Sequence, residues 1–151
     1  MLARMRQSAK KENDGGFTLI ELLVVMIIIG ILAAIAIPVF LSQRAKAQDS
    51  AAKADVSTIG KEVATYWIDQ TTAPATLVVT SGRYVLAGSD IGKASANVVL
   101  NAPASGALNT TAWTANAWCV GVNNPNGQQR TYKYSAQNGL EPGQCATNIA
   151  P

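Results

Sequence analysis

Hydrophobic residues divide the chain into three parts. Residues 1–16 are basic, residues 17–43 are almost wholly apolar, and residues 44–151 mix apolar and polar positions with many Gly, Asn and Thr residues. The run from Leu22 to Phe40 is 19 residues long and is interrupted only by Gly30 and Pro38. That length is close to the number a helix needs to cross a hydrocarbon core. Because the run is apolar on all sides, we predict a membrane segment rather than a core helix.

The residues before this segment predict its orientation and its processing. Basic residues precede it, so the positive-inside rule leaves the N-terminus in the cytoplasm and sends the rest of the chain outward. An ordinary secretory signal has a small-residue cleavage site after its apolar core. Here Gly15 and Gly16 stand before the core instead. Cleavage at this point would remove a leader, residues 1–16, and keep the membrane helix.

The helix is expected to continue beyond the membrane segment, to about residue 67. The sequence after Pro38 is rich in Ala, Lys, Gln and Glu, which favour helix. Asp49 and Lys53 have the spacing and order of a stabilising i,i+4 ion pair. A one-sided apolar stripe follows a helical period; its members are Ala52, Val56, Ile59, Val63 and Trp67. This stripe needs a folded domain to cover it.

Two residues are expected to disturb the first half of the helix. Pro38 removes a backbone hydrogen bond and clashes with the preceding turn, which predicts a kink or local melting near Ala34. Gly30 weakens the same stretch. Since proline is common in membrane helices, its presence also has an explanation that involves no special role.

The body, residues 44–151, supplies several short strand candidates. Ser81 and Gly82 separate two of them and predict a two-residue hairpin, and the segment NNPNGQQ is a loop dense in turn-forming residues. We expect an α+β fold in which the long helix, about 17–67, packs against a small antiparallel sheet of about four strands. The candidate strands are residues 76–80, 83–87, 97–100, 117–122 and 130–135.

Composition and charge narrow the possible functions. The net charge of +3 divides into 4 − 2 = +2 for residues 1–16 and 8 − 7 = +1 for the rest, so the body lacks the clustered basic surface of nucleic-acid binders. The chain has no His, which excludes His-based acid–base catalysis. Asp69, Asp90 and Glu141 are isolated acids outside any calcium-loop pattern. We therefore expect no cofactor, no metal and no enzymatic activity.

The two cysteines, Cys119 and Cys145, predict a disulfide. An even cysteine count in an exported chain is typical of a bonded pair, whereas two free thiols would be expected if the body stayed in the cytoplasm. Closing this loop would stabilise the fold by roughly 3–4 kcal/mol in the chain-entropy model.

The segment GFTLIELLVVMIIIGILAAIAIPVF, residues 16–40, closely resembles the N-terminal segment of type IV pilins and of the pseudopilins of type II secretion. The resemblance covers about 25 residues and is most like a type IV pilin. It implies a pilin-like fold with a disulfide-closed C-terminal loop. It divides the chain into a leader at 1–16, a transmembrane and filament-core segment at 17–43, and the amphipathic half-helix with a globular head at 44–151.

The same resemblance assigns roles to individual residues. Gly16 would be the last leader residue, and a prepilin peptidase would cut the Gly16–Phe17 bond and N-methylate Phe17. Glu21 would meet the N-terminal amine of a neighbouring subunit, and Pro38 matches the place where the family's helix loosens in filaments. The implied partners are other pilin subunits, the peptidase, the membrane and an inner-membrane assembly machinery.

Glu21 is informative independently of the resemblance. A carboxylate in an apolar helix is costly and usually pairs with another group. After cleavage, the new amine of Phe17 would lie four residues away, on the same helix or on a staggered neighbour. Pairing with a neighbour would also fix the axial register between subunits. The alternative is that Glu21 lies in the headgroup region and is solvated there.

Three functions follow from these observations. The first is a structural subunit of a type IV pilus, a surface filament for adhesion, motility or DNA uptake. The subunit would wait in the membrane with its N-terminus in the cytoplasm before assembly. The second is a pseudopilin of type II secretion, which forms a short periplasmic filament. The third is a membrane-anchored enzyme or ligand-binding domain, for which the sequence offers no nucleophile–base pair, metal cluster or phosphate loop.

Overall fold

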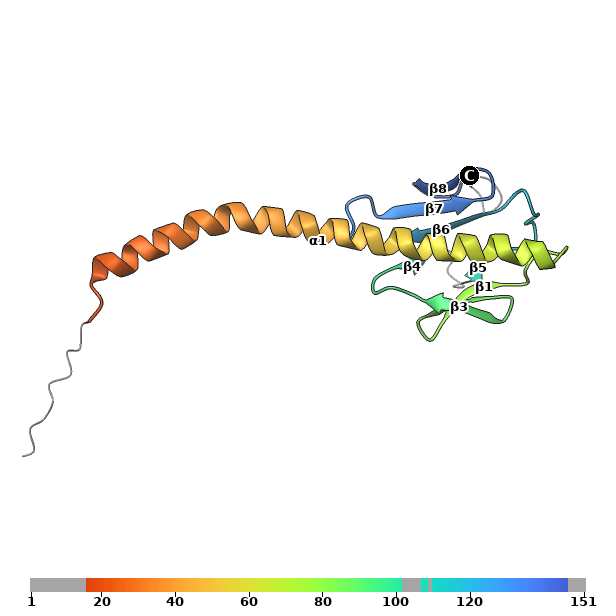
Figure 1. Cartoon of the computed structure of the whole chain (residues 1–151), viewed down its shortest axis with the longest axis horizontal. Helices are drawn as coiled ribbons and strands as arrows, with labels where there is room; N and C mark the ends of the chain where they lie inside the picture. The colour runs from red at the N-terminus through yellow and green to blue at the C-terminus, as the bar shows by residue number, and fades with distance from the viewer. Residues whose placement is uncertain (1–15, 102–106, 109, 147–151) are drawn as a thin grey trace, which may run out of the picture. The chain divides into compact units, whose positions relative to one another are not determined.

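A computed structural model describes residues 16–101, 107–108 and 110–146 of the chain. Contacts divide the chain into two units, Met1–Pro38 and Val39–Pro151. The first unit contributes the N-terminal part of one long helix, and the second contains the rest of that helix with all the strands that the structure describes. The element order is one helix followed by eight short strands (Figure 1).

Helix α1 spans Leu19–Asp69. It begins directly after Thr18 and ends shortly before Pro74, which cannot continue a helix. The predicted helix of about 17–67 is thus confirmed with a shift of two residues at each end. All residues from Gly30 to Pro38 are helical, so the local melting expected near Ala34 is not found in this described stretch. The kink stays a prediction.

In the first unit, the side chains of α1 are exposed on every side. Its most apolar 18-residue window is long and apolar enough to cross a membrane, and none of that window is buried. Such a helix also resembles a signal sequence in these properties, and the exposure is what separates it from a buried core helix. Within the described part of the chain, nothing covers this apolar surface.

In the second unit, the first sheet has the strand order β3-β2-β1-β5, and all its pairs are antiparallel. Ser81 and Gly82 have positive φ angles of 51° and 72° and join β1 to β2 in a two-residue turn, as predicted. Ala87 and Gly88 make a second such turn before β3. The strands are β1 (Leu77–Thr80), β2 (Arg83–Leu86), β3 (Ser89–Lys93) and β5 (Ala107–Leu108).

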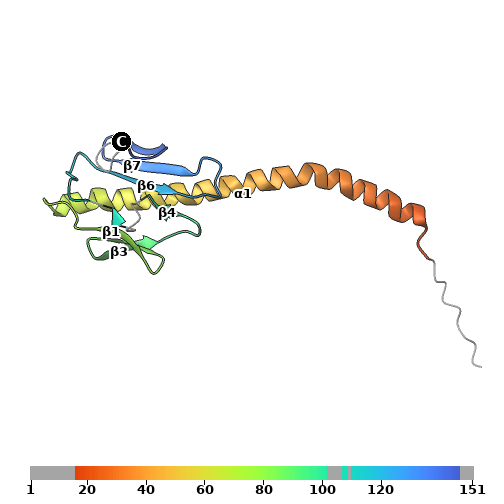
Figure 2. The same cartoon turned by 180° about the vertical axis from the view of Figure 1, so that it is seen from behind.

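The second sheet has the order β4-β6-β7-β8 and is also antiparallel. Its strands are β4 (Val99–Leu100), β6 (Cys119–Asn123), β7 (Thr131–Ser135) and β8 (Gly139–Pro142). On β7, Tyr132 and Tyr134 share the face toward the helix, and Lys133 pairs with Glu141 on the other side. Figures 1 and 2 show β6–β8 on one side of the helix and β1–β3 on the other.

One hydrophobic core joins the helix to both sheets. Ala52, Val56, Ile59 and Val63 are fully buried, which confirms the predicted stripe, and Trp67 packs against the core at its edge. The indole of Trp118 stacks on Tyr134, with ring centroids 5.9 Å apart. The other core residues are Leu77, Tyr84, Leu86, Val98, Leu100, Trp113, Val120, Val122 and Tyr132. Trp113, Trp118 and Tyr84 are thus core residues.

The α+β class and the Cys119–Cys145 disulfide are confirmed. The strands form two sheets of four, where the sequence predicted a single sheet of about four strands. The strand predicted at 83–87 stops at Leu86 because Ala87 adopts a left-handed φ of 49°, a conformation that is costly for alanine. The polar strands β3 and β8 show little apolar alternation and were not anticipated.

Gly60 marks the closest approach between α1 and the second sheet. A Cβ at this position would overlap the ring of Tyr134. We predict that Gly60→Ala lowers the free energy of unfolding of the mature protein by about 1–3 kcal/mol, since overpacking forces the ring or the helix to move. Urea titration in detergent, followed by tryptophan fluorescence, measures this.

The same substitution at Gly30 is the control, because a Cβ there meets no atom within 4 Å. Gly30→Ala should leave the unfolding of the head unchanged. Equal effects of the two substitutions would contradict the close contact at Gly60.

Candidate functional site: the helix N-terminus and the exposed face of the helix

The first turn of α1 is closed by a reciprocal cap. The backbone N–H and the hydroxyl of Thr18 donate hydrogen bonds to Oε2 of Glu21, at 2.8 and 2.9 Å. The backbone N–H of Glu21 donates in return to Oγ1 of Thr18, at 3.3 Å. This is the capping box, which satisfies helix N–H groups that have no intrahelical partner. It explains why the helix begins after Thr18.

Glu21 is the only charged residue from Phe17 to Gln43. In the structure its side chain is exposed and bonds locally to Thr18 through one oxygen, and no other described residue contacts the carboxylate by a hydrogen bond or an ion pair. The negative charge lies at the positive end of the helix dipole, which is favourable. Glu21 therefore has one established role as a cap and retains an oxygen for a further donor.

The proposed cleavage point lies outside the helix. Gly16 and Phe17 are in irregular structure, Phe17 is 83% exposed, and a Cβ at Gly16 would meet no atom within 4 Å. The remainder of the predicted leader, residues 1–15, lies outside the described residues. The residues that the structure describes thus leave the Gly16–Phe17 bond sterically open.

Asp49 attaches the loop between β6 and β7 to the helix. Its carboxylate is largely buried and accepts hydrogen bonds from three consecutive backbone N–H groups, those of Gln128, Gln129 and Arg130, at 3.0–3.2 Å. Gly127 is required beside it, since a Cβ would overlap the carboxylate. The predicted Asp49–Lys53 ion pair is wrong. Asp49 turns into the loop because three backbone N–H groups replace its lost hydration better than one exposed ammonium would.

Lys53 has a different contact. Its Nζ lies 5.1 Å from the ring centroid of Tyr132, in cation–π geometry. The contact holds the lysine stem against the sheet while the residue as a whole stays exposed.

Asp55 attaches the first sheet to the helix in the same way. Its carboxylate, also buried, accepts the Tyr84 hydroxyl at 2.8 Å and the N–H and hydroxyl of Ser95 at 2.8 and 2.7 Å. Burial, followed by the hydrogen bond and the charge of Asp55, raises the pKa of Tyr84. The phenol is therefore held in its neutral, donating form.

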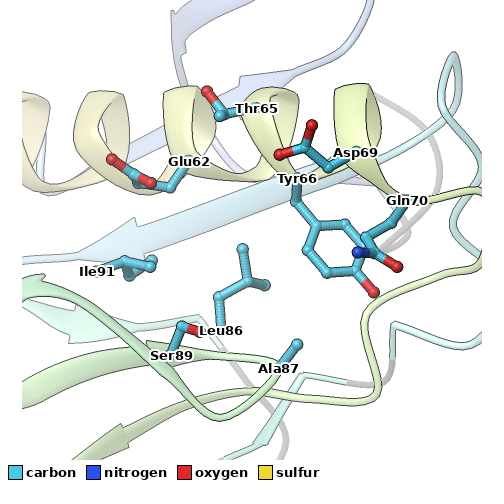
Figure 3. Close-up of a pocket in the computed structure, with 9 residues that line it drawn as sticks. All are labelled: Glu62, Thr65, Tyr66, Asp69, Gln70, Leu86, Ala87, Ser89 and Ile91. Atoms are coloured by element: carbon cyan, nitrogen blue, oxygen red, sulfur yellow. The ribbon is translucent and has the colours of Figure 1, made fainter.

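Two shallow hollows flank the exposed face of α1 within the second unit. One, of about 440 Å³, lies between the helix and strands β2 and β3; Figure 3 shows Tyr66 reaching from the helix toward Leu86 and Ala87, with Glu62 and Asp69 alongside the helix. The other, of about 500 Å³, lies beside the β6–β7 loop and is lined by Lys46, Lys53 and Tyr132. The described residues contain no group of three His, Cys, Asp or Glu side chains placed to hold a metal ion.

Other acids considered in the sequence are engaged on the surface. Asp90 pairs with Arg83, and this hydrogen bond, with one from the N–H of Gly92, holds the pKa of Asp90 below its ordinary value. Glu141 pairs with Lys133 at 3.4 Å. Each acid thus stabilises a strand pair.

Comparison with known proteins identifies the family. Residues 12–37 match the model of the prokaryotic N-terminal methylation motif. Over 138 residues, the chain is 31% identical to fimbrial protein EcpC of Eikenella corrodens, which covers 91% of this chain and 86% of EcpC. The chain belongs to the type IV pilin and pseudopilin superfamily. The family consists of structural subunits, and no solved structure matches this member closely enough to add to the comparison.

Other relatives match less than half of this pilin-family chain. It is 49% identical over 55 residues to the type IV major pilin protein PilA of Myxococcus xanthus, and 37% identical over 67 residues to the type II secretion system core protein G of Pseudomonas aeruginosa. These matches cover 36% and 44% of this chain, and they span only 25% and 47% of the relatives. Both branches of the superfamily therefore appear among its relatives.

The structure groups some predicted site residues and separates others. Phe17 and Glu21 line one shallow hollow at the start of the helix, whereas Cys119 and Cys145 close the C-terminal loop of the head. Sequence reasoning missed three features: the Thr18 cap and the two buried aspartates. The motif T-x-x-E was readable in the sequence, but Asp49 and Asp55 resemble solvated helix residues until their partners, 29 to 81 positions away, are placed.

Tyr84 gives this pilin-family head a specific pH dependence. Because its pKa is raised in the fold above the ordinary value of 10.0, the unfolded chain loses this proton first as the pH rises. The stabilisation is complete below pH 10 and is lost above it. Tyr84→Phe should lower the free energy of unfolding by about 1.5–3 kcal/mol at pH 7, for the lost bond to a carboxylate.

Urea titrations of both proteins at several pH values from 7 to above 10 measure this. The wild-type protein should lose stability above pH 10 more steeply than Tyr84→Phe. Parallel pH profiles would show that the Tyr84 phenol ionises equally in the folded and unfolded chains.

Proposed function

We propose that this chain is the precursor of a type IV pilus subunit. In this proposal, a prepilin peptidase removes residues 1–16, and the mature subunit polymerises through its N-terminal helix into a surface filament. The observation that carries the proposal is the exposed, all-round apolar first part of α1, headed by one carboxylate. A soluble monomer would expose this surface to water, which is strongly unfavourable.

Maturation is proposed to act at the exposed Gly16–Phe17 bond. Hydrolysis leaves the carboxylate of Gly16 on the leader and a free amine on Phe17. The same peptidase then transfers a methyl group from a methylsulfonium donor to this amine, which releases the thioether and a proton. The exposure of both residues and the lack of a side chain at Gly16 support access to a peptidase cleft. Before assembly, the helix would hold the subunit in the membrane with its N-terminus in the cytoplasm, as the basic leader favours.

Assembly is proposed to exchange lipid for neighbouring helices. The apolar surface stays out of water in both states, so an inner-membrane assembly machinery can lift the subunit without exposing it. Glu21 then meets the amine of a neighbouring Phe17. The capping box supports this role, because it orients the carboxylate and leaves one oxygen open to a further donor.

A pseudopilin of a type II secretion system is the alternative. The matches to protein G of such systems, each over 44% of the chain, support it. The match to fimbrial protein EcpC extends over 91% of the chain and supports the pilus. Adhesion, motility or DNA uptake would be the filament's task.

Intact-mass spectrometry of the mature protein tests the processing. We expect a mass that lacks residues 1–16, gains one methyl group on Phe17, and rises by two hydrogens on reduction of the disulfide. The sample is taken from a host with a working prepilin peptidase. A full-length mass from that host would contradict the proposal, and the apolar segment would then be a plain membrane anchor.

Substitution of Glu21 tests the assembly step separately. Glu21→Gln should leave cleavage unchanged and reduce the yield of sheared filaments by at least about tenfold, as expected for one lost charged pair in a desolvated site. Thr18→Ala is the matched variant, because it removes the hydroxyl of the cap and keeps the carboxylate.

The two variants separate the roles of Glu21. If Glu21 pairs with a neighbour's amine, Thr18→Ala assembles far better than Glu21→Gln. Equal loss in both variants would mean that Glu21 acts only as a helix cap.

A further inference from the structure

The second unit buries only one side of its helix. Seven residues of α1 are buried, all on a single side: Asp49, Ala52, Asp55, Val56, Ile59, Gly60 and Val63. The opposite half of the helix is exposed between the two sheets. Its borders differ in charge. Lys46 and Lys53 follow the border toward the second sheet, and Glu62 and Asp69 follow the border toward the first. We call these the lysine rim and the acidic rim.

The two rims match in spacing and direction. Lys46 and Lys53 are seven residues apart, and so are Glu62 and Asp69, so each pair lies on one face about 10 Å in length. Each acid lies 16 residues beyond its corresponding lysine. At about 100° per residue, 16 residues rotate the helix by about 160°, which places the rims on nearly opposite sides.

Among the residues that the structure describes, none forms an ion pair with either rim. The ion pairs among the described residues are Arg83–Asp90 and Lys133–Glu141, and neither includes a rim residue. The acids near the lysine rim are unavailable, because Asp49 and Asp55 are buried and bonded to the sheets. All four rim residues are exposed, and each rim borders one of the two hollows. Each rim thus offers charge and space to an incoming surface.

We propose that the lysine rim of one copy binds the acidic rim of a second, parallel copy. In this contact the two helices run in the same direction and are shifted by 16 residues, which at about 1.5 Å per residue is a stagger of about 24 Å. With this shift Lys46 lies against Glu62 and, at the same time, Lys53 lies against Asp69. Because different surfaces meet, the first copy keeps its acidic rim free and the second copy keeps its lysine rim free. The contact therefore does not close and continues into an open array.

The contact sets register rather than affinity. Exposed ion pairs contribute about 0–1 kcal/mol each, so two of them cannot hold a filament together. Opposite charges do, however, disfavour wrong alignments, in which like charges meet. If the second copy moves by seven residues from the matched alignment, for example, only one lysine–acid pair can form, and one lysine and one acid stay unpaired. The cation–π contact with Tyr132 holds Lys53 near the border of the second sheet and so reduces the entropy lost on pairing.

This inference rests on the proposed polymerisation, and disulfide trapping in assembled filaments tests it. The full chain is expressed in a piliated host with cysteine pairs at the rims, and sheared filaments are oxidised. The native cysteines are already bonded to each other. Lys46→Cys with Glu62→Cys, and Lys53→Cys with Asp69→Cys, should each give a ladder of covalent oligomers. Lys46→Cys with Asp69→Cys, misplaced by about 10 Å, should give at least about tenfold less.

Charge reversal provides a second test. The double variants Lys46→Glu/Lys53→Glu and Glu62→Lys/Asp69→Lys should each lower filament yield at least about tenfold, and their combination should restore it. Lys61→Glu is the control. Lys61 is exposed on the same helix between the rims, so its reversal should leave the yield unchanged.

The outcomes separate this inference from the proposed function. Wild-type chain that is processed but forms no filament overturns both. Filaments that cross-link only through the misplaced pair, or that tolerate both reversals, overturn the rim contact alone. Loss of membrane retention in Lys46→Glu/Lys53→Glu, without cross-links from the matched pairs, would assign the lysines to anionic lipid headgroups and also overturn it.

Discussion

Two buried carboxylates on one helix hold the head together. Asp49 binds three amides of the β6–β7 loop, and Asp55 binds Tyr84 and Ser95 beside the first sheet. Removing a carboxylate from water is costly unless charge-assisted hydrogen bonds replace the lost hydration, and here they do. Each aspartate thereby fixes one sheet to the helix at a defined height, and the apolar stripe between them fills the common core.

This arrangement also determines what the helix leaves exposed. Because the sheets approach from two sides, the buried side of α1 is narrow, and the outer half remains free. The carboxylates on the buried side are hydrogen-bonded to backbone and hydroxyl donors and do not pair with the exposed charges. The exposed charges of the helix therefore stay segregated. Lysines follow one border and acids the other. The surface offered to a second copy is thus a consequence of how the core is built.

The N-terminal unit obeys a different constraint. Its apolar side chains are exposed, and apart from the hydrogen bond that Pro38 cannot donate, the helix itself satisfies the backbone groups in its interior, as a hydrocarbon environment requires. Its first turn, where N–H groups lack intrahelical partners, is closed by Thr18 and Glu21. A single acidic residue can therefore serve as a cap in the isolated subunit and remain open to a donor from a neighbour.

The sequence alone determined the long helix, its apolar first half, the stripe from Ala52 to Val63 and the cysteine pair. These features depend on periodicity, length and residue count, which are local or additive properties. The tertiary structure decided which polar residues of the helix are buried. Asp49 looks like a partner of Lys53 until the β6–β7 loop is in place, and Ala87 looks like a strand residue until the hairpin reverses there. In each case a contact with a distant residue, or a strained backbone conformation, overrides the local structural preference of the residue. The spacing of residues in the sequence does not reveal such a contact.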